Sequence, residues 1–199
     1  PYPGYATFPV GVKARVYDAF TLHPVLAELD MVVSVAKLKV HSTTGVTLAL
    51  KNLIGLAPTS EYRRSEADNN RSWFHGNVNF DTRLPRVVID LNETVPVKLA
   101  IIDGIMTSEG GAGPWDANLI QIKPGILAAG FDPVATDAVG TALMGFDPEA
   151  QSGSFPFVGG ENHLILAREA RLGTNILSEI GIRGPAITEL KVPFKPART

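Results

Sequence analysis

Residues 31–55 read MVVSVAKLKVHSTTGVTLALKNLIG, and this stretch decides the fold class of the chain. Its first part, 31–35, is rich in β-branched residues and almost continuously apolar, which is typical of a strand buried on both faces. The Ser-Thr-Thr-Gly sequence at 42–45 can cap a helix, and the residues after it predict a helix over 46–54 that ends at Gly55. We therefore expect a strand, a short connection and a helix.

The remainder of the chain continues this alternation. Strands are expected over 10–16, 98–102, 125–129 and 180–183, and helices over 82–92, 132–144 and 162–171, with a helical turn at 23–29. The pattern indicates an α/β domain whose mainly parallel or mixed sheet is flanked by helices. We expect one domain over 1–199, with an N-terminal arm (1–9), a long polar loop (59–80) and a C-terminal tail (185–199).

The composition is that of a folded domain. Hydrophobic residues make up 45% and charged residues 19% of the chain, which excludes a disordered, collagenous or fibrous protein. No apolar run reaches the roughly 20 residues that span a bilayer, so no membrane span is predicted. The sequence begins at Pro1 and shows no signal peptide, so a processed or truncated product is expected. A cytoplasmic location is expected, with a removed export signal as the alternative.

Cysteine is absent from the chain. This excludes disulfides, thiolate catalysis, cysteine-bound zinc and an iron–sulfur cluster held by the chain's own cysteines. The residues predict no particular cofactor. An isoelectric point near 6.1 and a single aromatic pair beside arginines, Trp73 and Phe74, argue against a nucleic-acid partner.

The net charge of −2 is unevenly distributed along the chain. The segment 37–86 holds eight basic and four acidic residues, whereas 87–199 holds eight basic and thirteen acidic ones. A basic stretch in an acidic chain is either a local anion site or a solvated basic surface.

The first candidate site follows the strand at 31–35. Lys37, Lys39 and His41 are spaced two residues apart, so in a continued strand their side chains share one face. They stand at the carboxyl end of the strand, where open α/β sheets bind ligands. The alternative is that these residues lie on an exposed edge or pair with the acidic half of the chain.

The expected helix that follows adds further polar groups to this site. Thr44, Thr47 and Lys51 fall on one helical face, and Asn52 adjoins Lys51. Its free N–H groups and its dipole favour an anion. Crowded cations should lower the pKa of at least one of them and so create a neutral lysine or histidine base.

Acidic residues form a second group. Asp132 before Pro133 is expected to cap a helix. Asp137 lies among apolar neighbours on that helix, and a buried carboxylate needs a partner, so we expect it to meet Lys37, Lys39 or Lys51, or a metal.

Two further ideas concern a metal and the loops. Asp103, Glu109 and Asp137 could together bind a divalent cation such as Mg²⁺, although their spacing does not require one. The glycine-rich segment 110–113 matches no phosphate-binding motif and is expected to be a mobile lid or a turn. His75, in the polar loop, could swing over a site or have no role.

Four blocks of the sequence resemble signature stretches of the domain of unknown function 362 family. They are AKLKVH (36–41), TGVTLALKNLIG (44–55), IDGI (102–105) and AGFDPVATDAV (129–139), within a region of resemblance over 24–184. The chain departs from the family pattern at Ala36, Val40 and Leu48, where proline, threonine and a small residue are usual. The family's cations are kept at positions 37, 39, 41 and 51.

The resemblance implies a metabolic context for the protein but no particular enzymatic activity. Members are often joined to ferredoxin-like cluster domains, which implies a redox context and a ferredoxin-like partner. Members also usually carry a further α/β segment ahead of this region. The resemblance therefore implies a fragment whose sheet is incomplete on its N-terminal side, or a sheet completed by a partner chain.

We predict an enzyme or binding domain for a small anionic molecule bearing carboxylate or phosphate. The candidate catalytic residues are His41 for proton transfer, Lys39 and Asp137; the candidate ligand-binding residues are Lys37, Thr44, Thr47, Lys51, Asn52, His75 and Asp103. The alternative is a non-catalytic module that docks a redox or iron–sulfur partner, and a homo-oligomer is a further alternative.

Overall fold

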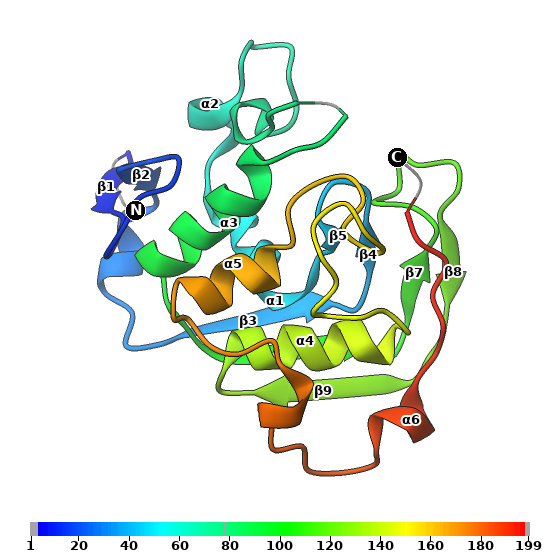
Figure 1. Ribbon diagram of the computed structural model, residues 1–199. Helices are drawn as coiled ribbons and strands as arrows, with labels where there is room; N and C mark the ends of the chain where they lie inside the picture. The colour runs from blue at the N-terminus through cyan, green and yellow to red at the C-terminus, as the bar shows by residue number, and fades with distance from the viewer. Residues whose placement is uncertain (1–3, 78, 198–199) are drawn as a thin grey trace.

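A three-stranded mixed sheet lies at the centre of the computed structural model, which describes residues 4–77 and 79–197 (Figure 1). Strand β3 (Val32–Lys37) pairs in parallel with β6 (Val97–Gly104), and β6 pairs antiparallel with β9 (Ile126–Gly130). The strand order β3-β6-β9 confirms the α/β class with a mixed sheet.

The helices are arranged in two layers on one face of this sheet. Helices α1 (Leu48–Asn52) and α4 (Pro133–Leu143) pack directly against the strands, and α3 (Arg83–Thr94) and α5 (His163–Glu169) pack on α1 and α4. Asp132 caps α4 as expected, because its side chain accepts the amides of residues 134 and 135. None of the helices in the described residues is long and apolar enough to cross a membrane.

Short elements complete the described structure. The paired strands are β1 (Ala6–Pro9) with β2 (Ala19–Leu22), β4 (Val40–His41) with β5 (Gly45–Val46), and β7 (Thr107–Glu109) with β8 (Ile120–Ile122). The short helices are η1 (Pro24–Ala27), η2 (Leu53–Leu56), α2 (Thr59–Tyr62), η3 (Ser72–Phe74), η4 (Leu177–Glu179) and α6 (Ile187–Leu190).

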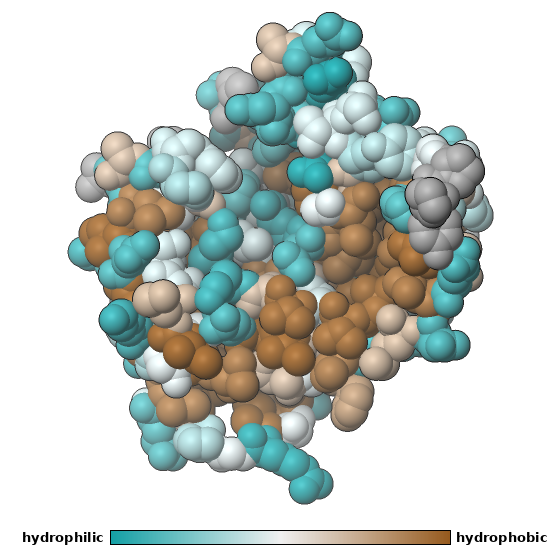
Figure 2. Space-filling model, turned by 180° about the vertical axis from the view of Figure 1, so that it is seen from behind, coloured by the Kyte–Doolittle hydropathy of each residue, from teal (hydrophilic) through white to brown (hydrophobic). Residues whose placement is uncertain are grey.

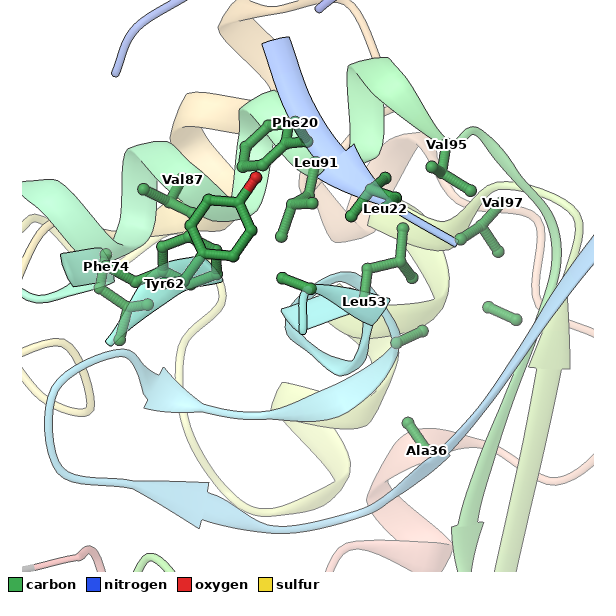
Figure 3. Packing of buried hydrophobic residues seen from close by; sticks show 14 residues of the cluster. Phe20, Leu22, Ala36, Leu53, Tyr62, Phe74, Val87, Leu91, Val95 and Val97 are labelled. Atoms are coloured by element: carbon green, nitrogen blue, oxygen red, sulfur yellow. The ribbon is translucent and has the colours of Figure 1, made fainter. Parts of the chain in front are cut away.

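The polar segment 59–80 is more ordered than its composition predicts. It contributes two buried aromatic rings, Tyr62 and Phe74, to a hydrophobic cluster with Phe20 and Leu91 (Figure 3). The ring centroids of Tyr62 and Phe74 lie 4.7 Å apart. Burial of these rings fixes the segment in place, although most of its other residues are exposed. Position 78 lies outside the described residues.

Two predicted strands are absent from the described residues. Over 10–16 the chain forms a loop between β1 and β2, because the buried carboxylate of Asp90 accepts the backbone N–H groups of Arg15, Val16 and Tyr17. Over 180–183 the chain is irregular. In both segments, no neighbouring strand among the described residues forms the ladder of backbone hydrogen bonds that a β-strand requires.

The segments near both ends of the chain also contain more regular structure than expected. The predicted arm contains β1, and the predicted tail contains α6. The amides of Val192 and Phe194 donate to the carbonyl groups of Leu143 and Met144, which ties the tail to the end of α4. Residues 1–3 and 198–199 lie outside the described residues.

The second face of the sheet is uncovered. Val33, Val35 and Leu127 point outward and are 39%, 59% and 62% exposed. Seen from behind, the molecule shows many apolar side chains gathered together (Figure 2). The prediction that 31–35 is buried on both faces is therefore wrong for this chain, because no element in the described residues covers that side.

Asp137 of α4 holds the first turn of α1. Its oxygens accept the backbone N–H groups of Ala49 at 2.8 Å and Leu50 at 2.9 Å. These amides are among those that a helix start leaves unpaired. The expected lysine partner is therefore wrong, and so is the expected cap at 42–45, which forms the turn between β4 and β5.

We expect Asp137→Ala to lower the free energy of unfolding by about 3 kcal/mol, because two buried amides lose their acceptor. Asp137→Asn keeps one acceptor oxygen and should lose about half as much. Urea denaturation measures both effects, with Asp30→Ala, an exposed carboxylate, as the control. An Asp137→Ala protein as stable as the unmodified protein would show that these bonds do not hold α1.

Candidate functional site

Two lysines and a histidine meet where β3 passes into α1. Lys39 and His41 lie on the chain after β3, and Lys51 lies on α1. The backbone N–H of Thr47 donates to the Lys39 carbonyl at 3.0 Å, which places the start of α1 beside Lys39. Thr47 is the N-cap of α1, and Lys51 lies near the end of this helix. The structure therefore brings Lys39 close to the start of α1, but the expected single strand face of Lys37, Lys39 and His41 does not form, because β3 ends at Lys37.

Residues from α5 and from the segment 59–80 also act electrostatically on this group. Burial, followed by the charges of Lys51, Lys39, His75 and His163, holds the pKa of His41 well below its usual value. Burial and the charge of Lys51 lower the pKa of His163 to about 3. We call Lys39, His41, Lys51 and His163 the basic cluster.

The Lys51 side chain has no carboxylate counter-ion among the described residues. Its side chain is half-buried, and burial, followed by the charge of Lys39, lowers its pKa to about 7. In residues 4–77 and 79–197, neither Lys39 nor Lys51 forms an ion pair with a carboxylate. Positive charge is rarely buried without a negative partner, so the site is electrostatically incomplete.

Lys39 connects the basic cluster to the glycine-rich segment. Its ammonium group donates to the carbonyl of Ala112, and burial lowers its pKa. The segment 110–113 is buried, so the expectation of a mobile lid is not supported by its packing. The segment instead forms part of the wall around Lys39.

His41 has a defined tautomer in this ring orientation. Its Nδ1 accepts the backbone N–H groups of Thr43 at 3.2 Å and Thr44 at 3.4 Å. A neutral imidazole that accepts at Nδ1 carries its hydrogen on Nε2. The Nε2–H group of His41 is therefore available to donate a hydrogen bond to a ligand. In this tautomer His41 does not act as the proton acceptor of the site.

Two buried polar side chains of the site lack partners. Both ring nitrogens of His163 and the hydroxyl of Thr47 are buried and form no hydrogen bond with the described residues. Leaving such a group unpaired costs about 1–3 kcal/mol, so a bound molecule that pairs with it is favoured. Sequence reasoning missed His163, whose only signal is its place directly after the helix cap Asn162.

Glycines allow the loop over 153–160 to close one side of the site. A Cβ on Gly45, whose φ is +69°, would lie 2.8 Å from the carbonyl oxygen of Pro156. A Cβ on Gly160 would lie 2.5 Å from the Asp81 carbonyl. Asp81 also accepts from His75, with Nδ1 and Oδ2 3.3 Å apart, so His75 is held at the rim of the site.

Other predicted site residues lie elsewhere or have structural partners. Lys37 points to the uncovered face, where its Nζ lies 2.6 Å from Oδ2 of Asp103. Asn52 donates to Ser34 and Val35 of β3. The hydroxyl of Thr44 donates to the Val46 carbonyl, so only its amide contributes to the site, through His41.

The suggested metal-binding carboxylates do not meet. Asp103 pairs with Lys37, Asp137 binds the amides of α1, and Glu109 accepts the amide of Lys195. Across the described residues, no three metal-ligating side chains of His, Asp or Glu gather into a site. Each carboxylate already has a different partner, so this trio gives no support to a divalent cation.

Comparisons with known proteins agree with the sequence blocks described above. The model of a domain of unknown function, DUF362, matches residues 3–142, which include all four blocks. The thylakoid-associated protein sll1697 of Synechocystis sp. is 28% identical over 172 residues, which cover 86% of this chain and 43% of that protein. The chain thus spans less than half the length of this curated relative. No solved structure matches.

The family match covers well over half of the chain, and it includes Lys39 after β3, His41 in β4 and Lys51 in α1. The chain therefore belongs to the DUF362 family.

Proposed function

We propose that the basic cluster binds a small molecule bearing a carboxylate or phosphate group, and that the chain is the anion-binding part of an enzyme. The observation that carries this proposal is that neither Lys39 nor Lys51 has a carboxylate partner within residues 4–77 and 79–197. A bound anion would supply the missing negative charge.

Each member of the site has a distinct part in this proposal. Lys39 and Lys51 attract the anion, and charge-assisted hydrogen bonds of this kind are stronger than neutral ones. His41 donates from Nε2, and the hydroxyl of Thr47, the N-cap of α1, has no hydrogen-bond partner in the described residues. Asp137 acts at a distance, since it fixes α1 and so positions Lys51.

We expect sulfate to raise the melting temperature of the protein, and Lys39→Met or Lys51→Met to weaken the apparent affinity about tenfold, since each removes one charge-assisted hydrogen bond. Differential scanning fluorimetry across a sulfate titration measures this. Lys98→Met is the matched control, because Lys98 is exposed on β6 away from the cluster. Equal stabilisation of all four proteins would place the anion elsewhere and refute the proposal.

The same titration should depend on pH. Lys51 is protonated below its pKa of about 7 and neutral above it, so sulfate affinity should fall as the pH rises from about 6 to about 8.5. Sulfate keeps its charge over this range, and the lowered pKa values of His41 and His163 keep both rings neutral. In Lys51→Met the fall should disappear; a fall that persists in this variant would exclude Lys51 as its source.

A second candidate function is the docking of a protein partner on the uncovered face of the sheet. Register places Val33 beside Leu99 and Val35 beside Ile101, forming uncharged rows across the strands. An adjoining groove of about 780 Å³ lies between β9, α4 and the segment 174–190. A contiguous apolar face of this kind is typical of an interaction surface.

For this second candidate we expect a ferredoxin-like iron–sulfur protein to bind, and Val35→Asp to abolish binding by introducing a charge into the interface. Val12→Asp is the control, because Val12 is 97% exposed and lies outside the sheet. Titration calorimetry measures affinity, and light scattering measures mass. Unchanged binding by Val35→Asp, or self-association through this face in place of ferredoxin binding, would refute the candidate.

A further inference from the structure

We propose that Lys51 is a reactive amine, which forms an imine with the carbonyl carbon of a small anionic carbonyl compound such as a 2-oxo acid. This inference rests on the proposed function, because it uses the same site. It adds the substrate class and the nucleophile.

The first requirement is a lysine whose lone pair is available. The side chain of Lys51 forms no hydrogen bond or ion pair with the described residues, and the charge of Lys39 acts on it. A lysine becomes a nucleophile when it is desolvated or placed beside another cation, and Lys51 meets both conditions. Its lowered pKa of about 7 leaves close to half of the amine neutral at pH 7. Lys37, by contrast, is exposed and paired with Asp103.

The second requirement is an anchor and a hydrogen-bond donor for the substrate. The ammonium of Lys39 is the cation beside Lys51 and can hold the carboxylate of a 2-oxo acid. His41 is neutral with its hydrogen on Nε2, and a neutral imidazole can polarise a carbonyl oxygen by donating to it. The unpaired side chains of Thr47 and His163 offer further hydrogen bonds to the substrate.

The reaction is balanced without an oxidant or a reductant. The lone pair of Lys51 Nζ attacks the carbonyl carbon and forms a C–N bond, and the C=O π electrons move to the oxygen. Both hydrogens of the neutral amine then leave with this oxygen as water, and a C=N bond remains. The amine and the carbonyl compound thus give an imine and one water molecule.

A purely structural role is the main alternative for a half-buried lysine. A structural lysine in such a place is paired with a carboxylate or with carbonyl groups, because an unpaired charge destabilises the fold. Lys39 fits that description in part, since it donates to Ala112. Lys51 has no such partner in the described residues, which points to chemistry rather than to support.

Trapping with glyoxylate and sodium cyanoborohydride tests the inference. Cyanoborohydride reduces an imine to a stable secondary amine, so peptide mass spectrometry should find carboxymethyl-lysine at position 51. We expect Lys51 to be labelled about tenfold faster near pH 7 than Lys98 and Lys123, which are exposed lysines of the same molecule. Lys39→Met should slow the labelling of Lys51, because it removes both the anchor and the cation that favours the neutral amine.

Formaldehyde provides the matched uncharged probe. If Lys39 anchors the carboxylate, the ratio of glyoxylate to formaldehyde labelling should be higher at Lys51 than at Lys98, and sulfate should suppress the glyoxylate reaction. If Lys51 is labelled no faster than Lys98 while sulfate still binds through Lys51, the imine inference is wrong and the anion site stands. If sulfate binding also does not depend on Lys51, the proposed function is wrong as well.

Discussion

The position of α1 depends on hydrogen bonds from two other helices, and the candidate site depends on α1. The side-chain oxygens of Asp137 in α4 accept the amides of Ala49 and Leu50, and the side-chain amide of Asn92 in α3 donates to the Leu50 carbonyl at 2.9 Å. A five-residue helix is too short to be stable by itself. These contacts, together with the apolar packing of Leu48 and Leu50, give Lys51 a fixed place beside Lys39.

The acidic residues in the described part of the chain do not neutralise the two lysines of the candidate site. Most of the acidic residues follow position 87, yet none of them forms an ion pair with Lys39 or Lys51 within the described structure. Burial lowers the pKa of each lysine, and it raises the pKa of Asp137 to about 8 against the opposing effect of its two backbone amides. A site with two lysines and no carboxylate partner in the described residues favours a negatively charged ligand.

The chain that leaves β3 connects the uncovered face of the sheet with the basic cluster. Val33, Val35 and Lys37 point to the uncovered face, and the apolar part of that face ends at the Lys37–Asp103 pair. Lys39, two residues further on, belongs to the basic cluster because the chain has left the strand. A partner docked on β3 would therefore lie close in sequence to the cluster, although the two surfaces are distinct.

The sequence by itself determined the features that depend on neighbouring residues. The amphipathic spacing predicted α3, the Asp132–Pro133 pair predicted the start of α4, and the apolar run predicted β3. The ordered blocks also identified the family. In each case local side-chain spacing or capping chemistry was sufficient. The closeness of Lys39, His41 and Lys51 in the sequence also suggested a common site, although the expected strand face shared with Lys37 does not form.

Only the tertiary structure decided which distant groups meet. It paired Asp137 with the amides of α1 instead of a lysine, and it turned Lys37 away from the cluster. It also brought His163 to Lys51 from more than a hundred residues away and left one face of the sheet uncovered. Contacts of this kind depend on how helices and strands pack against one another, and no local pattern of residues encodes that packing.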